Sequence, residues 1–316
     1  MKEQTGTFVA YDTLCTVRLF SDTPCRELID GVQHLALEVQ NALNMYDSDS
    51  ELSRLCRESR TGQSYPISPM LLDFLLWNQR FYLETGGAFD PTVGGLVKLW
   101  DFLADDPRVP TEAEIAAQRS KTGFSRVHIN EAQRCVSFGC EDLVIDPGAS
   151  GKGYALKLAV NYLRSAGVEQ AVLDFGGNMF AIGGRPADGR SWRVALRDPD
   201  DPTTYSGTVE LYDCGIATSS WYEHSFVRDG TIYHHLLDPR TGRPKPLTLK
   251  SVSILSSDGA FTDFLSTAVF LLGEDDGTAL IQRLREQSGE RIDYVLIRKD
   301  GSVCASPGVY TPRTQE

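Results

Sequence analysis

The segment "RIDYVLIRKDGSVCAS" (Arg291 to Ser306) decides the fold class. Its two apolar runs flank Asp300-Gly301, and an Asp-Gly pair between strand-like runs is typical of a tight β-hairpin turn. Asp229-Gly230 repeats this signal within "RDGTIYHHLL". A hairpin pairs its strands antiparallel, whereas a Rossmann-type sheet alternates strands with helices. The sequence therefore favours an α+β fold with largely antiparallel sheets flanked by helices.

Capping signals mark several predicted helices. Ser68 precedes Pro69 and a long apolar stretch, which is typical of an N-cap followed by the first helical turn. Thr111 and Glu114 have the spacing of a capping box. From caps and apolar periodicity we expect helices over 24–44, 68–87, 110–120, 151–167 and 260–272. Short strands are expected at 125–129, 134–138, 142–146, 170–177 and between 191 and 256.

Composition excludes several classes of protein. The 316 residues carry 43 acidic and 31 basic side chains, a net charge of −12, which disfavours a nucleic-acid partner. No apolar run is long enough for a membrane span, and no signal peptide or lipobox is visible, so we expect a cytoplasmic location. The seven cysteines form no C-x-x-C pair, and free thiols are expected.

A glycine-rich turn, "DPGASGKGYA" (Asp146 to Ala155), opens one predicted helix. The phosphate loop of NTPases requires glycine where Asp146 stands and Ser or Thr where Gly153 follows Lys152, so this reading fails. A helix N-terminus still attracts phosphate through free N–H groups and its dipole. The turn therefore remains a candidate phosphate site.

One apolar helix, "FTDFLSTAVFLL", contains the clearest candidate metal ligands. Asp263 is its only charged residue, and Thr267 follows four residues later on the same helix face. A carboxylate and a hydroxyl one turn apart suit Mg²⁺ or Ca²⁺. The alternative is structural: an aspartate that binds helix N–H groups and a threonine that bonds back to the i−4 carbonyl.

Two further motifs are open to two readings. The first is "TIYHHLLDPRTGRP". In the functional reading, His234 or His235 is a general base or a phosphate contact. In the structural reading, the two point to opposite faces of a strand, one into the core and one to the surface. In "TGGAFDPTVGGLVKLW", Phe89 and Asp90 either hold a flat ring and its polar edge or are a core aromatic and an N-cap. Asp174 begins the sequence "DFG", the metal-binding motif of protein kinases, but the other kinase motifs are missing from the sequence, so a kinase is not indicated.

Seven of these segments, in order and over roughly residues 45–270, resemble the FAD:protein FMN transferases, or ApbE-type flavin transferases. The matching segments are "YDSDSELSRL", "TGGAFDPTVGGLVKLW", "IDPGASGKGYALKLAV", "VLDFGGN", "ATSSWYE", "YHHLLDPRTGRP" and "TDFLSTAVF". The resemblance implies one ApbE-like domain over 1–316, with a FAD cleft between two lobes. It also implies a Mg²⁺-dependent reaction in which a Thr or Ser hydroxyl of an acceptor flavoprotein, or its FMN-binding domain, takes the FMN part of FAD and AMP leaves.

The resemblance also assigns roles to individual residues. The implied metal ligands are Asp263, Thr267 and the carbonyl of Ala149, and the implied catalytic residues are His235, Lys152 and Asp263. The implied FAD-binding residues are Tyr11, Tyr46, Ala88, Phe89, Asp90, Asp146, Lys152, His235 and Leu236. Because Lys152 would lie near the phosphates, the glycine-rich turn becomes a pyrophosphate site for a flavin dinucleotide.

The sequence departs from the family pattern in places. The usual Met-Gly-Thr reads Tyr11-Asp12-Thr13, so Tyr11 would replace the methionine in packing, and "ATSG" reads "ATSS", with Ser220 in place of glycine. Two alternatives stay open: a FAD pyrophosphatase giving FMN and AMP, and a FAD-binding protein without turnover. A redox flavoenzyme is disfavoured because no G-x-G-x-x-G follows a strand.

Overall fold

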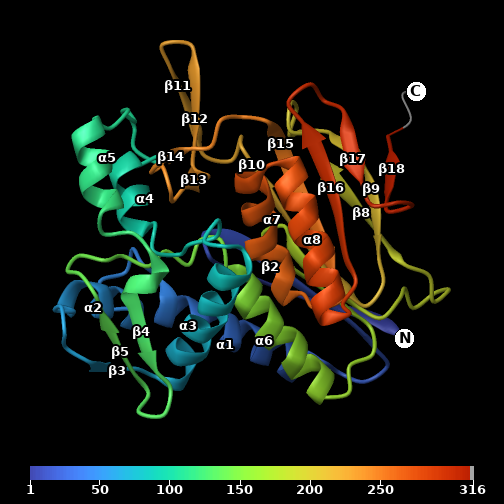
Figure 1. The fold of residues 1–316 in the computed structure, drawn as a ribbon. Coiled ribbons are helices and arrows are strands. Elements are labelled where there is room, and N and C mark those ends of the chain that lie inside the picture. The colour runs from blue at the N-terminus through green and yellow to red at the C-terminus, as the bar shows by residue number, and fades with distance from the viewer. Residues whose placement is uncertain (314–316) are drawn as a thin grey trace. The chain divides into compact units, whose positions relative to one another are not determined.

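The computed structural model describes residues 1–313, which form two compact units (Figure 1). The first unit contains residues 1–38, 152–220 and 247–313, and the second contains 39–151 and 221–246. Every pair of named strands is antiparallel, and the only parallel pairing among the described residues is an isolated bridge between Val93 and Val144. The predicted α+β class is confirmed.

The first unit is built on an eight-stranded sheet with the order β1-β2-β6-β7-β10-β15-β16-β17. Its strands are β1 (Lys2–Ala10), β2 (Thr13–Ser21), β6 (Ala171–Phe175), β7 (Asn178–Ile182), β10 (Cys214–Ser220), β15 (Leu249–Ser256), β16 (Ile292–Arg298) and β17 (Val303–Ala305). A three-stranded sheet contains β8 (Trp192–Arg197), β9 (Tyr205–Leu211) and β18 (Tyr310–Pro312).

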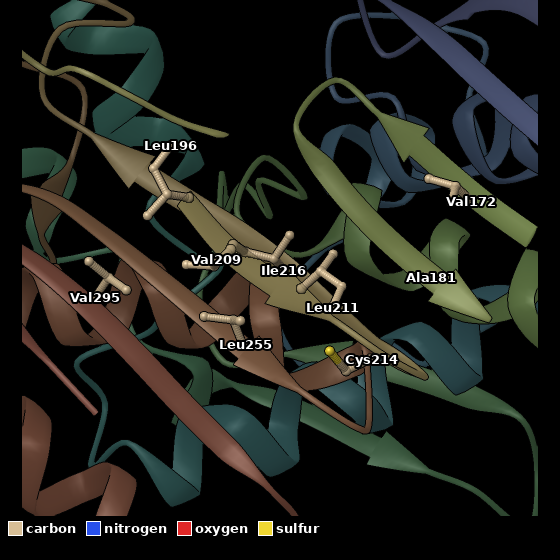
Figure 2. Close-up of a cluster of buried hydrophobic side chains, with 9 residues drawn as sticks. All are labelled: Val172, Ala181, Leu196, Val209, Leu211, Cys214, Ile216, Leu255 and Val295. Atoms are coloured by element: carbon tan, nitrogen blue, oxygen red, sulfur yellow. The ribbon is translucent and has the colours of Figure 1, made fainter. Parts of the chain in front are cut away.

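Apolar side chains from both sheets of the first unit form one core cluster. Figure 2 shows Ile216 and Leu255, from β10 and β15, beside Val209 and Leu211 of β9. Because side chains alternate along a strand, the neighbours Ala217 and Ser219 face the opposite side of β10. The large sheet is therefore covered by the small sheet on one face, and helices are free to cover the other.

Helix α7 (Ala260–Leu272) packs against β10 and β15, and α8 (Glu274–Ser288) packs against β16 (Figure 1). The unit also contains α6 (Gly151–Ser165), which begins at the last residue of the second unit, and the first part of α1 (Arg26–Leu43). Gly31 of α1 lets Tyr162 of α6 come close, since a Cβ on Gly31 would lie 2.3 Å from the Tyr162 hydroxyl oxygen. The helices predicted over 24–44, 151–167 and 260–272 are confirmed.

The second unit combines short helices with three small pairs or triplets of strands. Its helices are α2 (Glu51–Glu58), α3 (Pro69–Glu84), α4 (Gly94–Trp100), α5 (Glu112–Arg119) and the 3₁₀ helix η1 (Phe124–Arg126). Its strands are β3 (Tyr65–Pro66), β4 (Val127–Asn130), β5 (Cys135–Phe138), β11 (Ser225–Arg228), β12 (Thr231–His234), β13 (Leu237–Asp238) and β14 (Arg243–Pro244). The buried residues Leu96, Trp100, Ile115 and Leu237 form one hydrophobic cluster around α4.

The predicted caps are present. Ser68 accepts a hydrogen bond from the Leu71 N–H with Pro69 in the first turn of α3, and Thr111 and Glu114 form a complete capping box. The strand predicted over 142–146 is wrong. Instead, the Val144 carbonyl accepts from the Gly94 N–H at 3.2 Å, and the Asp146 N–H donates to the Pro91 carbonyl at 2.6 Å. Val144 and Asp146 thus form hydrogen bonds to Gly94 and Pro91 in place of the regular hydrogen bonds between β-strands.

Candidate functional site

The site residues of the first unit gather where α7 passes the start of α6. The Gly153 N–H donates to Asp263 Oδ2 at 2.8 Å, so a carboxylate from α7 binds one of the N–H groups that the first turn of α6 leaves without a helical partner. The arrangement places negative charge at the positive end of the helix dipole, which stabilises it. Asp263 and the predicted phosphate turn are therefore brought together.

Asp263 retains capacity to bind a cation. The residue is only 6% exposed, and no donor in residues 1–313 hydrogen-bonds to its second oxygen, Oδ1. Burying a carboxylate with a single hydrogen bond is costly unless another positive group neutralises it. Oδ2 therefore caps a helix, as in the structural reading, and the metal reading of Asp263 stays a prediction.

Thr267 lies next to two serines that the sequence alone did not single out. Its Oγ1 lies 3.0 Å from Ser219 Oγ of β10, and Ser219 Oγ lies 2.8 Å from Ser266 Oγ. The i−4 bond expected in the structural reading is absent from Thr267, because the Asp263 carbonyl accepts from Ser266 Oγ at 2.8 Å. A contact across 48 residues of chain leaves no local signal in the sequence.

Gly153 is required at this place because no side chain fits there. A Cβ atom on Gly153 would lie 2.6 Å from the Cβ of Asp263, which is well inside van der Waals contact. We expect Gly153→Ala to lower the free energy of unfolding by about 1–3 kcal/mol, as overpacking typically does. Denaturant unfolding tests this, with Gly151→Ala as the control, since a Cβ there meets only Pro147 at 3.3 Å. Equal effects of the two variants would contradict the steric argument.

Lys152 is partly buried, and its charge acts on the buried thiol of Cys15 in β2. Burial raises the pKa of Cys15 to about 11, and the lysine opposes this only weakly. Cys15 is therefore protonated at neutral pH and is not a nucleophile. All seven cysteines are free thiols, as expected.

Tyr11 has an internal partner for its hydroxyl. The Oη donates to the Ala36 carbonyl at 2.5 Å, and burial raises the pKa of Tyr11 well above its usual range. The residue forms the β1–β2 turn with Asp12, both at φ 55°, and its ring packs against Phe175. Tyr11 thus packs within the first unit, and its role toward FAD stays a prediction.

In the second unit, Asp90 holds two loops together. Its Oδ1 accepts from the Thr92 N–H at 2.9 Å and the Thr92 hydroxyl at 2.6 Å, and its Oδ2 accepts from the Phe124 N–H at 3.2 Å. Burial raises the pKa of Asp90, while these hydrogen bonds oppose the rise. Ala88 and Phe89 are also buried. This stretch therefore has a structural role, and its role in binding FAD stays a prediction.

Asp146 lies beside that stretch, since its N–H binds the Pro91 carbonyl. Its Oδ1 accepts from the Gly148 N–H at 2.7 Å, and burial raises the pKa of the carboxyl. The turn continues to Ala149, whose carbonyl accepts no hydrogen bond from the described residues. Two motifs predicted to bind FAD, around Asp90 and around Asp146, are thus adjacent within the second unit.

The two histidines differ in their environments. His234 is 1% exposed, its Nε2 donates to the Lys245 carbonyl at 2.8 Å, and its Nδ1 accepts from the Leu236 N–H at 3.3 Å. Both ring nitrogens are therefore used by the backbone. His235 is partly exposed, and its Nδ1 lies 3.3 Å from the His224 carbonyl. A carbonyl can only accept, so Nδ1 carries the proton that faces it. The role of His235 as a general base stays a prediction.

Buried His234 predicts a pH dependence of stability. Burial lowers its pKa, so the folded state resists its protonation. Above about pH 6.5, the ordinary histidine pKa, His234 is neutral in the folded and unfolded states and its burial costs no stability. As the pH falls toward the lower folded pKa, the unfolded state binds the proton first, and the folded state loses stability. We expect the wild type to lose up to about 1.4 kcal/mol per pH unit more than His234→Gln in this window. Unfolding curves at several pH values check this, and parallel slopes would contradict it.

A hollow of about 350 Å³ lies beside Tyr46, whose side chain is 66% exposed. Two basic residues, Arg57 and Lys98, contribute to its lining together with buried Cys56. Asp142 also lines the hollow, and Arg57 forms an ion pair with Glu58, so the charges around Tyr46 are of both signs. Of these lining residues, the family resemblance implied only Tyr46, and Arg57 and Lys98 carry no signal because they occur in ordinary helical contexts.

Within the described residues, no three His, Cys, Asp or Glu side chains gather as a metal cluster. The donors at Asp263 and Thr267 are instead one carboxylate and one hydroxyl, a hard-oxygen pair that fits Mg²⁺. None of the described helices is both long and apolar enough to span a bilayer.

Comparison with known proteins identifies the family of this chain. The model of the ApbE family matches residues 11–290. The chain belongs to the ApbE family. It is 32% identical over 326 residues to the FAD:protein FMN transferase of Treponema pallidum, covering 98% of this chain and 88% of that protein. It is 33% identical over 254 residues to the enzyme of the same name from Vibrio cholerae, covering 79% and 75%.

Solved structures of the family share the fold. The ApbE protein of Thermotoga maritima superposes with a TM-score of 0.86 at 26% identity, covering 97% of each chain. The apo flavinyl transferase ApbE of Pseudomonas stutzeri gives a TM-score of 0.82 at 28% identity, covering 97% of this chain and 95% of that one. These similarities confirm the resemblance and the fold class inferred from the sequence motifs.

Proposed function

We propose that this protein transfers the FMN part of FAD to a Thr or Ser hydroxyl of an acceptor flavoprotein, with Mg²⁺ as cofactor. The relatives' shared name, FAD:protein FMN transferase, supports the reaction class. The observation that carries the proposal here is the pair of oxygen donors on α7, with Asp263 Oδ1 uncommitted and Thr267 one turn away. A protein that only stored FAD would need neither.

The reaction forms one bond and breaks one. The acceptor oxygen attacks the phosphorus on the FMN side, the bond from that phosphorus to the bridging pyrophosphate oxygen breaks, and AMP leaves with that oxygen. The proton of the attacking hydroxyl passes to the imidazole of His235, the proposed general base. The products are an FMN phosphoester on the acceptor, AMP and one proton.

The chain's residues divide this work. Asp263, Thr267 and the Ala149 carbonyl would hold Mg²⁺, which when bound neutralises pyrophosphate charge. Lys152 would bind the phosphates at the N-terminus of α6. Tyr11, Tyr46, Ala88, Phe89, Asp90, Asp146 and Leu236 would bind or support FAD. We also propose that residues 1–316 act as one catalytic domain.

Removal of the metal tests the proposal directly. Without divalent metal, we expect AMP release from FAD in the presence of an acceptor to fall at least about a hundredfold, because uncompensated phosphate charge repels the nucleophile. Chromatography of AMP, FMN and FAD, with EDTA and then with excess Mg²⁺, measures this. AMP release that is unchanged by EDTA would contradict the metal assignment, and equimolar free FMN without modified acceptor would favour the pyrophosphatase.

A further inference from the structure

Four oxygen atoms form a hydrogen-bonded row within the first unit: Thr267 Oγ1, Ser219 Oγ, Ser266 Oγ and the carbonyl oxygen of Asp263. The successive distances are 3.0, 2.8 and 2.8 Å. The row joins β10 to α7 and returns to the residue that binds Gly153. We call these four groups the hydroxyl row.

The chemistry of its last member fixes the direction of every proton in the row. The Asp263 carbonyl can only accept, so Ser266 uses its one hydroxyl proton there. Ser266 must then accept from Ser219, which leaves Ser219 without a second proton. Ser219 must in turn accept from Thr267. The order of donation is therefore Thr267 to Ser219 to Ser266 to the Asp263 carbonyl.

This direction determines what Thr267 offers to a ligand. Its hydroxyl proton points to Ser219, so its lone pairs are left for another partner, and no donor among the described residues binds them. A metal ligand must present lone pairs and keep its proton away from the cation. The row thus holds the Thr267 hydroxyl in the orientation that a cation requires.

From this geometry we infer that Ser219 is a positioning residue for the metal site: it takes the proton of Thr267 and so presents the threonine oxygen to a divalent cation. The inference rests on the proposed function, and it deepens that function by adding two residues that do not themselves bind the metal. Partners of metal ligands typically influence affinity 10- to 100-fold. Ser266 contributes because it accepts the hydroxyl proton of Ser219, which keeps that proton away from Thr267.

A second pair of hydroxyls, which also begins on β10, provides a matched control. Thr218 Oγ1 and Ser253 Oγ lie 2.7 Å apart and join β10 to β15, as the hydroxyl row joins β10 to α7. Thr218 precedes Ser219, so it faces the other side of the sheet. Ser253→Ala therefore removes a buried hydroxyl and one hydrogen bond without touching the row.

The experiment is a titration of the whole protein with Mn²⁺ at saturating FAD, followed by electron paramagnetic resonance, which measures bound metal without turnover. We expect Ser219→Ala to raise the Mn²⁺ dissociation constant about tenfold. Ser219→Thr, which keeps the hydroxyl, should stay within about threefold of wild type, and Ser253→Ala should not change it. FMN transfer measured against Mg²⁺ concentration should show the same ranking.

Ser266→Ala provides a second and independent variant, since alanine is well tolerated in a helix. Ser266 makes no hydrogen bond to Thr267 among the described residues, yet its loss frees the Ser219 proton to occupy a lone pair of Thr267. We therefore expect weaker Mn²⁺ binding here too. If the wild-type protein binds Mn²⁺ and transfers FMN, and both alanine variants bind Mn²⁺ with wild-type affinity, the inference on Ser219 is overturned while the proposed function stands. Wild-type protein that binds no Mn²⁺ would overturn the proposed metal function and the inference with it.

Discussion

Asp263→Asn is expected to reduce FMN transfer by at least about a hundredfold, because it removes the only charged metal ligand proposed on α7. Asparagine keeps the size of the side chain, and its amide oxygen can still accept from the Gly153 N–H. The fold should therefore survive while the charge is lost. Initial rates at saturating FAD and several Mg²⁺ concentrations measure the effect.

The control for this variant is Asp275→Asn. Asp275 also lies in the first turn of a helix, α8, but its side chain is exposed and is not proposed to bind metal or FAD. Its replacement should leave the rate within about twofold, as surface changes usually do. If Asp263→Asn transferred FMN as fast as Asp275→Asn, the carboxylate would be a helix cap and not a metal ligand.

His235→Ala is expected to lower the rate of transfer by about 10²- to 10⁴-fold, the usual contribution of a general base. The loss should appear at saturating FAD, and FAD binding followed by fluorescence should change much less. Raising the pH should partly restore the rate, since the acceptor hydroxyl then loses its proton more readily to solvent. Pre-steady-state measurement of AMP release separates this step from product dissociation.

His128→Ala is the matched control, since His128 is an exposed histidine on β4 of the same unit. It should transfer FMN at the wild-type rate. A full rate in His235→Ala would remove the proposed base, and an equal loss of FAD affinity and rate would indicate a binding role instead. His234 is unsuited to the role because backbone groups occupy both of its ring nitrogens.

Features encoded by neighbouring residues were predictable from the sequence. The Ser68 cap, the Thr111–Glu114 capping box and the Asp229-Gly230 turn each depend on residues within a few positions. Both residues of that turn adopt positive φ, at 51° and 74°, which Asp and Gly tolerate. The strand predicted over 142–146 failed because its polar backbone binds Pro91 and Gly94, which are distant in sequence.

The candidate site was predictable to the extent that its residues lie in recognisable motifs. Asp263 and Thr267 share a helix face because they are four residues apart. Ser219 was not predictable as their neighbour, because the contact depends on α7 packing against β10, 48 residues away in the chain. The hydrogen bond from Gly153 to Asp263 was not predictable either, since the two residues are 110 positions apart in the sequence. Sheet order is a property of the whole chain and leaves no short signal.

The most direct test is the intact mass of an acceptor after incubation with this protein, FAD and Mg²⁺. The probe is a purified FMN-binding flavoprotein domain, used both with its target Thr or Ser and with that residue changed to Ala. We predict that the intact domain gains one FMN phosphoester with one AMP released per modification, and that the Ala variant gains none. An acceptor of unchanged mass, with FAD either untouched or split to free FMN and AMP, would contradict the account.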